Sequence, residues 1–278
     1  MAAEEKKEIL QNSTLIKSKV LITVKTYPTL SNKYDELVCT AGFIEDGTWV
    51  RIYPIQFRKK PYDQQYKKYE WIEIDLVKNE EDFRPESYRP VSLDREIKIL
   101  GHISTKDNWA ERKKFVLGKV DDNLTELIAR SKDKSICTSL AVFKPSKILG
   151  FKIEEVEREW DKEKSDRLSQ VGLFEQSKNS LDLDVVKKLP YKFSYTFEDI
   201  EKKQSTLMIE DWEIGQLYWN CLARHEGNET KAVEDVKKKY FDEFVKTKDL
   251  HLFLGTTKSY HYVSPNPFII IGVFYPKK

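Results

Sequence analysis

The sequence has 278 residues, enough for one large domain or two ordinary ones, each with its own core. Its 48 basic and 46 acidic residues give a net charge of +2, so the overall charge favours neither a polyanionic nor a polycationic partner. Three widely spaced cysteines, Cys39, Cys137 and Cys221, fit a reducing compartment with buried thiols better than a secreted disulfide framework. With no signal-peptide pattern, and a longest apolar run over residues 268–274, we expect a cytoplasmic protein without a membrane span.

The first hundred residues have the composition of several strands. Asp46 and Gly47 separate two apolar runs, and glycine tolerates the positive φ of a tight hairpin turn. We predict strands over residues 20–27, 36–43, 49–53 and 71–77 and over part of 95–103. This part of the chain should form a curved, mostly antiparallel sheet or a small barrel.

Helical and strand patterns follow in turn. We predict helices over residues 108–116 and 123–131, the second with Asn123 and Glu126 at capping-box spacing, and strands over 139–143 and 148–153. A charge-dense and then polar run over 154–184 suggests a boundary near residue 170. We therefore expect a β-rich domain over 1–170 and a second domain over 171–278.

The second domain should have the order ββααββ, which makes the whole chain α+β. Its predicted strands are 191–197, 207–209, 250–254 and 268–275, and its predicted helices are 211–225 and 230–245. Alternating aromatic residues such as Phe193 and Tyr195 are best explained as core.

One stretch, residues 51–71, combines cations with aromatic rings. It has six basic residues against two acidic ones, a local charge of +4, and most of it lies in the loop after a strand. Cations displace counterions from phosphates, and rings stack on unpaired bases for about 1 to 3 kcal/mol each. The nucleic-acid-binding candidates here are Arg51, Arg58, Lys59, Lys60, Tyr62, Tyr66, Lys67, Lys68 and Tyr69.

The competing explanation is that these rings belong to the core and the lysines to a solvated rim. Against it, Tyr62, Tyr66 and Tyr69 lie in basic loop sequence that a core would not require, so we expect them on the surface. The next segment, residues 80–90, is acidic with two Arg-Pro pairs, and we expect it to fold over the basic loop through local salt bridges.

Two acidic groups are catalytic candidates. Asp211 and Glu213 stand at a predicted helix start, where they could gather a cation or a water, or simply cap the helix. Asp75 or Asp82, followed by Glu96 and Lys98, has the permissive outline of a metal-dependent nuclease. No cofactor motif is evident, and Mg²⁺ would be needed only by such a nuclease.

The four histidines form no zinc-ligand spacing with the cysteines, so we expect no metal site. His261 is a further nucleic-acid-binding candidate, because Tyr260 and Tyr262 flank it in a loop between two strong strands. The phosphate-binding, dinucleotide-binding, zinc-protease and serine-hydrolase motifs are all missing from the sequence.

Several segments together resemble a family of uncharacterised prokaryotic proteins. They are VLITVKTYP, GFIEDGTWVRIYPIQFR, DFRPES, SLAVFKPSKIL, MIEDWEIG, FLGTT and PFIIIGVFYP. The resemblance covers most of the chain, implies a mobile-element or phage-defence context and hence nucleic acid, and assigns no catalytic residue. The opening strand also resembles the ASCH and PUA-like small barrels that read modified bases, although the ASCH lysine and acidic residues are not cleanly placed.

The sequence leaves three hypotheses open. The first is a nucleic-acid-binding protein, in which the basic aromatic loop contacts phosphates and unpaired bases. The second is a metal-dependent nuclease or hydrolase that uses Asp211 and Glu213. The third is an interaction subunit, with a protein partner or a second copy of the chain covering its exposed rings.

Overall fold

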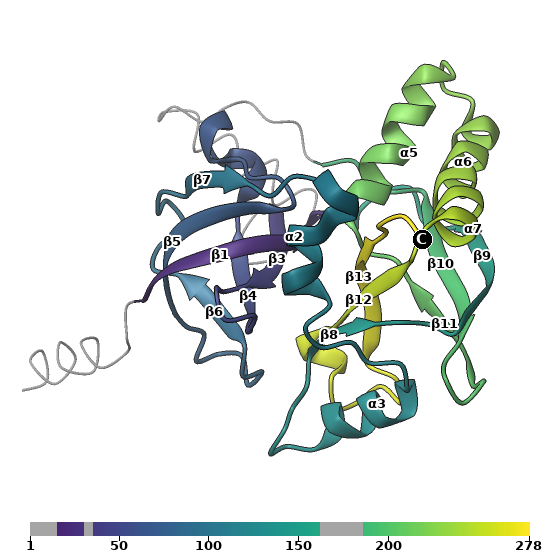
Figure 1. Ribbon diagram of the computed structural model, residues 1–278. Helices are drawn as coiled ribbons and strands as arrows, with labels where there is room; N and C mark the ends of the chain where they lie inside the picture. The colour runs from purple at the N-terminus through teal and green to yellow at the C-terminus, as the bar shows by residue number, and fades with distance from the viewer. Residues whose placement is uncertain (1–15, 31–35, 162–185) are drawn as a thin grey trace, which may run out of the picture.

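The computed structural model describes residues 16–30, 36–161 and 186–278. A β-barrel forms one part of the molecule, and a second part, built from two small sheets and several helices, lies beside it (Figure 1). The predicted α+β class is confirmed. Within the described ranges, no helix is at once long enough and apolar enough to cross a membrane.

Five strands close the barrel in the order β1-β3-β4-β6-β5, and β5 pairs back onto β1. Short strand β2 extends β3, and β7 pairs with the beginning of β5. Every pairing is antiparallel except that of β4 with β6. The strands are β1 (Ile16–Lys25), β2 (Thr29–Leu30), β3 (Glu36–Phe43), β4 (Trp49–Ile55), β5 (Glu70–Lys78), β6 (Ser87–Pro90) and β7 (Lys98–His102).

The hairpin between β3 and β4 forms where the sequence predicts it. The Thr48 backbone N–H donates to the Asp46 carboxylate, and Gly47 has a φ of +85°. Apolar side chains from all five strands fill the barrel interior, and Phe57 and Tyr66 from the β4–β5 connection join them. That connection also contains two short 3₁₀ turns, η1 (Phe57–Lys59) and η2 (Tyr62–Gln64).

Two helices connect the barrel to the second part: α2 (Lys106–Val116) and α3 (Leu124–Lys132). The beginning of α2 is irregular, because Asp107, Asn108 and Trp109 have positive φ. The capping prediction for α3 is confirmed, since the Asn123 side chain accepts a hydrogen bond from the Glu126 backbone N–H.

The second part contains two three-stranded sheets with the orders β11-β10-β9 and β13-β12-β8. Its strands are β8 (Leu140–Phe143), β9 (Lys147–Glu155), β10 (Tyr191–Glu198), β11 (Gln204–Met208), β12 (His251–Thr256) and β13 (Phe268–Phe274). Its helices are α5 (Trp212–Arg224), α6 (Glu229–Lys237), the π-helical segment η3 (Lys238–Glu243) and α7 (Phe244–Thr247), and a 3₁₀ turn, η4 (Lys258–Tyr260), follows β12.

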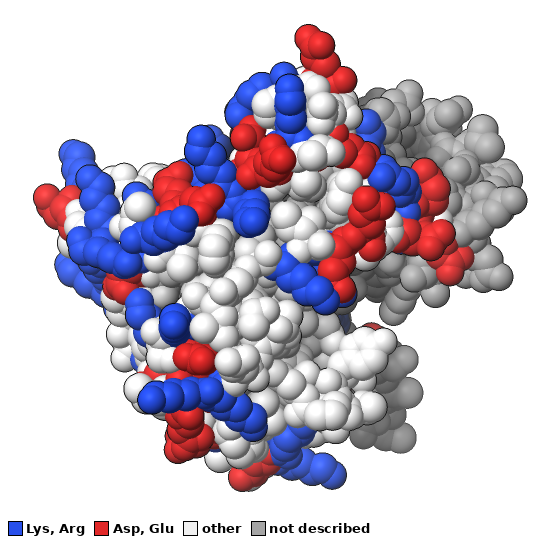
Figure 2. All heavy atoms as spheres, turned by 90° about the vertical axis from the view of Figure 1, so that its right-hand side faces the viewer, with Lys and Arg blue, Asp and Glu red and all other residues white. Residues whose placement is uncertain are grey.

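The predicted ββααββ order is present, but each of its two strand pairs is completed by an earlier strand. β9 pairs with β10, and β8 pairs with β12. The predicted boundary near residue 170 lies outside the described residues. On the face that Figure 2 shows, cations and carboxylates are intermingled, and no large region carries one sign of charge.

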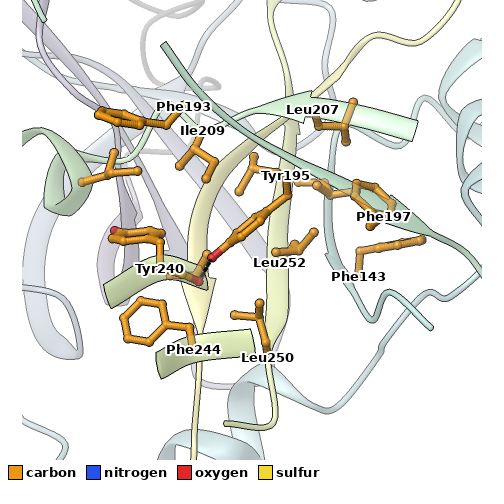
Figure 3. Close-up of a cluster of buried hydrophobic side chains, with 14 of the residues drawn as sticks. Phe143, Phe193, Tyr195, Phe197, Leu207, Ile209, Tyr240, Phe244, Leu250 and Leu252 are labelled. Carbon is orange, nitrogen blue, oxygen red and sulfur yellow. Dashed lines mark hydrogen bonds between the residues drawn. The ribbon is translucent and has the colours of Figure 1, made fainter. Parts of the chain in front are cut away.

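The core of the second part is rich in aromatic residues. From β10, Phe197 points toward Phe143 and Tyr195 toward the helical segment with Tyr240, while Phe193 lies in the same core against Tyr218 of α5 (Figure 3). The Tyr195 hydroxyl donates to the Tyr240 carbonyl, which satisfies the polar end of a fully buried ring. The expectation that these alternating rings form core is confirmed.

Candidate functional site

The basic aromatic stretch is not a continuous surface. Five of its nine candidates are buried, and the expectation that Tyr66 and Tyr69 are surface rings is corrected. Neither ring can stack on a base in this conformation. The buried candidates are Arg51, Lys60, Tyr66, Lys68 and Tyr69, and the accessible ones are Arg58, Lys59, Tyr62 and Lys67.

The barrel itself explains the burial of Tyr66. Its ring packs edge-on against Phe57, with centroids 4.9 Å apart, and its hydroxyl lies 2.5 Å from the Thr40 hydroxyl. Burial raises the pKa of Tyr66 well above its ordinary value. The Lys60 side chain is held by hydrogen bonds, because its ammonium donates to the backbone carbonyls of Leu93 and Arg95.

Lys68 connects the stretch to the predicted catalytic acids. Its Nζ lies 2.7 and 2.8 Å from the two carboxylate oxygens of Asp211 and 3.1 Å from Glu213 Oε2. Lys68 and Asp211 are buried, whereas the Glu213 side chain is 44% exposed. The basic loop and the start of α5 therefore do meet, but through a mostly buried ion cluster.

Burial alone would lower the pKa of Lys68, but Asp211 and Glu213 raise it above its ordinary value. Burial also raises the pKa of Asp211, and Lys68 offsets part of that rise. Asp211 in addition accepts the Glu213 backbone N–H as the N-cap of α5. The arrangement anchors the helix to the barrel, and both oxygens of Asp211 are occupied in doing so.

Lys25, at the end of β1, is a member of this cluster that the sequence analysis missed. Its Nζ lies 3.8 Å from the centroid of Phe57 and 4.5 Å from that of Trp212, and it donates to the Tyr66 carbonyl at 3.4 Å. Burial, followed by repulsion from Lys68, lowers the pKa of Lys25 to about 8. A lysine that ends the apolar run VLITV was the available signal.

Two of the other acidic candidates are also held by cations, whereas Glu96 is exposed. Asp75 forms an ion pair with Arg95, and Asp82 forms one with Arg84. In the described part of the chain, no group of three or more histidine, cysteine or acidic side chains could hold a metal ion. The nuclease hypothesis stays a prediction, and its version with Asp211 and Glu213 requires Asp211 to exchange Lys68 for a metal ion.

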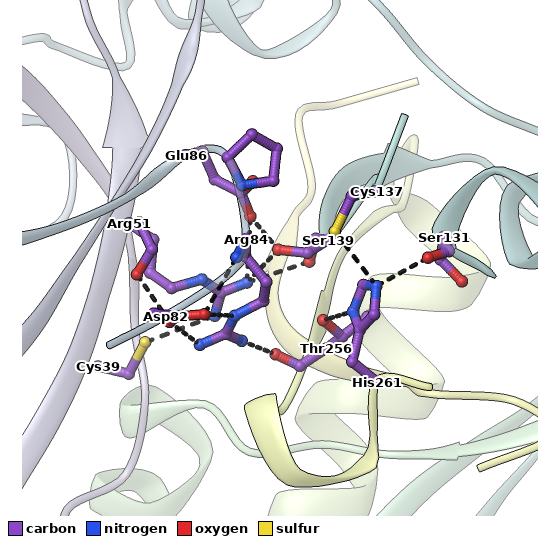
Figure 4. A network of polar contacts seen from close by, with 12 residues as sticks. Cys39, Arg51, Asp82, Arg84, Glu86, Ser131, Cys137, Ser139, Thr256 and His261 are labelled. Atoms are coloured by element: carbon purple, nitrogen blue, oxygen red, sulfur yellow. Dashed lines mark hydrogen bonds and ion pairs between the residues drawn. The ribbon is translucent and has the colours of Figure 1, made fainter. Parts of the chain in front are cut away.

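A second buried polar cluster lies between the DFRPES loop (residues 82–87) and the second part (Figure 4). Arg84 makes a bidentate contact with Asp82, at 2.8 Å through Nε and 2.5 Å through Nη2, and donates to the Thr256 carbonyl. The Ser87 hydroxyl donates a further hydrogen bond to the Asp82 carboxylate at 2.7 Å. The salt bridge is local, as expected, but the loop folds onto β12 and not over the basic loop.

Arg51 belongs to the same cluster. From β4 its Nη2 donates to the Ser139 carbonyl at 3.1 Å and to the Ser139 hydroxyl at 2.9 Å, with Glu86 at 3.5 Å. Arg51 is therefore a connection between the two parts and is not available to phosphate.

His261 is buried as well, which corrects its expected place in an exposed loop. Its Nε2 lies 2.7 Å from the Ser131 carbonyl, which can only accept, so Nε2 carries the proton and Nδ1 accepts from the Thr256 hydroxyl. Burial lowers the pKa of His261, which keeps the ring neutral. Cys137 Sγ lies 3.6 Å from Nε2, but that nitrogen cannot act as its base.

The residues around His261 are exposed instead. Tyr260 is 63% exposed, Tyr262 is 39% exposed, and Phe83 from the DFRPES loop is 46% exposed. Phe83 stacks on Tyr262 with centroids 4.9 Å apart. We use the name ring patch for these rings and the exposed aliphatic residues next to them: Phe83, Ile136, Tyr260, Tyr262 and Val263.

Together these features define a two-part α+β protein, in which buried ion clusters fasten a closed five-strand barrel to a second, helix-containing part. The chain belongs to the family described as Domain of unknown function (DUF8757), whose model matches residues 120–278. Residues 16–118 match a second model, Domain of unknown function (DUF8758). No curated protein matches the sequence. The implied gene context and the likeness to ASCH and PUA-like barrels stay predictions.

Proposed function

We propose that the protein binds unpaired nucleic acid, with the ring patch as its stacking surface. The observation that carries the proposal is that three exposed rings, Phe83, Tyr260 and Tyr262, lie on one loop or in contact with it. Large exposed apolar patches mark sites where a partner or a ligand binds. Each stacked base would contribute about 1 to 3 kcal/mol, whatever its identity.

Cations accompany the rings. Lys258 and Lys134 are exposed, and each precedes a patch residue by two positions, Tyr260 and Ile136 respectively. Their positive charge would attract phosphate and give binding a steep dependence on salt.

The loop is also held in shape before any ligand binds. The Lys132 ammonium donates to the carbonyls of His261 at 2.6 Å and Ser264 at 2.5 Å. A loop fixed in this way loses less conformational entropy on binding than a free one.

The accessible remainder of the basic stretch offers a second contact. Tyr62 is 87% exposed, and Lys59 and Lys67 near it in sequence are exposed too. This surface is a separate candidate for phosphate contacts.

The test is fluorescence anisotropy with labelled single-stranded DNA and RNA over a salt series. We expect affinity that falls as salt rises, and a further loss of about 5-fold or more in the Phe83→Ala/Tyr260→Ala double variant. Phe241→Ala, a half-buried ring on η3, is the control and should keep wild-type affinity. Absence of binding at low salt, or full affinity in the double variant, would overturn the proposal.

The same assay with Mg²⁺ or Mn²⁺ tests the nuclease hypothesis, because a nuclease would shorten the labelled strand. If the Asp211→Asn variant cleaves the strand as fast as the wild type, Asp211 is not a catalytic residue.

A protein interface is the second candidate, because two aliphatic residues belong to the patch. Val263 is 79% exposed and Ile136 is 49% exposed, and bases gain little from such side chains. If the patch joins two copies of the chain, sedimentation should show a dimer that Val263→Asp converts to a monomer. A monomer at all concentrations would remove the self-association version.

A further inference from the structure

A cavity of about 540 Å³ lies where the two family regions meet. Its walls come from the β3–β4 hairpin, the end of α2 with the following residues, and β8. Cavities that hold drug-sized ligands measure about 300 to 1,000 Å³ and are lined mainly by apolar side chains with a few polar groups. The size is therefore suitable for a nucleotide-sized molecule.

Three rings form the apolar side of the cavity: Phe43, Trp49 and Phe115. Trp49 lies against Phe43 with centroids 4.0 Å apart, and its edge contacts Phe253. Phe115 contacts Trp71 edge-on at 5.3 Å. Because Trp49 and Phe115 are only half-buried, each leaves aromatic surface for a flat ligand.

Charged groups of both signs complete the lining. Lys114 and Lys119 are exposed lysines at the end of α2 and just beyond it. Lys114 Nζ donates to Glu111 at 2.6 Å in an exposed ion pair, which a phosphate would have to replace. The carboxylates of Asp46 and Asp121 are held in place, by the Thr48 backbone N–H and by Arg130 respectively. An aromatic ligand that carries both an anionic group and N–H donors would match this arrangement.

We propose that this cavity binds a nucleobase that carries a phosphate. The base would lie against Trp49 and Phe115, its amino or imino groups would donate to Asp46 or Asp121, and the phosphate would contact Lys114 and Lys119. The ligand is either a free nucleoside monophosphate or a base turned out of a strand. The cavity and the ring patch are different surfaces, so this inference goes beyond the proposed function.

The experiment is isothermal titration of the full chain with each of the four nucleoside monophosphates, with adenosine and with inorganic phosphate. We expect at least one monophosphate to bind, and Lys119→Glu to weaken it about tenfold or more while affecting adenosine little. Lys237→Glu makes the same charge change on α6 and should have no effect. Trp49→Leu should weaken both the nucleotide and adenosine.

Trp49→Leu could weaken the fold because Trp49 packs against Phe43, whereas Lys119 is exposed and its variant should fold normally. If no monophosphate binds and Lys119→Glu leaves strand binding unchanged, the inference fails. Equal affinity in Lys119→Glu and the parent protein would also overturn it.

Labelled strands distinguish the two sources. If free nucleotides bind and also compete with the strand, the cavity binds both a base of the strand and a free nucleotide. Binding of strands alone, weakened by Lys119→Glu, would identify a base of the strand as the ligand. Nucleotide binding without strand binding would support the cavity and contradict the proposed function, whereas strand binding that depends only on the ring patch would do the opposite.

Discussion

The basic aromatic stretch and the ring patch both combine rings with cations, but most of the stretch is buried, whereas the rings of the patch are exposed. In the stretch, distant groups already bind the cations: the Asp211 carboxylate forms an ion pair with Lys68, and the Ser139 carbonyl accepts a hydrogen bond from Arg51. In the patch, Tyr260 and Tyr262 remain exposed over a buried histidine. The comparison shows that a basic, aromatic segment is buried where residues far away in the sequence supply hydrogen-bond acceptors or carboxylates for its cations.

Removal of Lys68 should have the largest effect. Lys68→Met leaves the buried Asp211 carboxylate without its cation, and we expect the free energy of unfolding to fall by about 3 to 5 kcal/mol. Lys67→Met makes the same change at the exposed neighbouring residue and should cost less than about 0.5 kcal/mol. Urea denaturation measures both, and equal losses would contradict the distinction between buried and exposed cations.

The pH dependence of stability should identify Lys25. Its pKa is about 8 in the folded protein against 10.5 for an ordinary lysine, so the unfolded chain holds the proton more tightly between these values. The contribution of Lys25 to stability therefore rises with pH across this window, by up to about 3 kcal/mol.

Lys25→Met should remove that rise. Lys19→Met is the control, because the Lys19 ammonium also lies near an aromatic ring, 5.2 Å from the centroid of Trp71, but its side chain is 44% exposed. This variant should keep the rise. Unfolding curves between pH 7.5 and 10.5 are the measurement. Parallel curves for the wild type and Lys25→Met would show that burial does not perturb this amine.

A glycine tests how closely α5 approaches the barrel. A Cβ on Gly215 would lie 2.2 Å from the Tyr27 ring, so Gly215→Ala should destabilise by about 1 to 3 kcal/mol through overpacking. Gly150→Ala is the control, because a Cβ there meets nothing within 4 Å. Thermal unfolding compares the two, and a harmless Gly215→Ala would mean that α5 is free to shift.

Tyr62 should show the smallest effect on stability. Because the ring is 87% exposed, Tyr62→Ala should change the free energy of unfolding by less than about 0.5 kcal/mol. The binding assay then decides its role: a weaker affinity for strands would add the accessible part of the stretch to the contact surface. Affinity equal to that of the wild type would leave the ring patch as the stacking surface.

Local signals predicted much of the fold. The turn at Gly47, the cap at Asn123 and the apolar stripe of α5 follow from neighbouring residues, and all three are present. Strand β6 was missed because it is four residues long and contains an arginine and a proline, although it closes the barrel.

The candidate site was harder to predict for a different reason. Lys68 and Asp211 are 143 positions apart, and no local pattern relates a loop lysine to a distant helix cap. Both residues were selected as candidates because of their charge, but Lys68 was expected to bind phosphate and Asp211 a metal ion or a water, whereas the two bind each other. Arg51 shows the same problem, since its acceptors at Ser139 lie 88 positions away.

The two polar clusters have a consequence for how the chain can be divided. A cut between the two family regions would take Thr256 and Ser139 from the two arginines of the barrel, and would take Asp211 from Lys68. The isolated barrel would then hold Lys68 without either of its acids, whereas Arg84 and Arg51 would keep Asp82 and Glu86, and the isolated second part would hold Asp211 without its cation. Fragments made at that point should be poorly soluble when expressed singly and should recover when expressed together. We therefore expect the two regions to fold as one unit, despite the two separate family models.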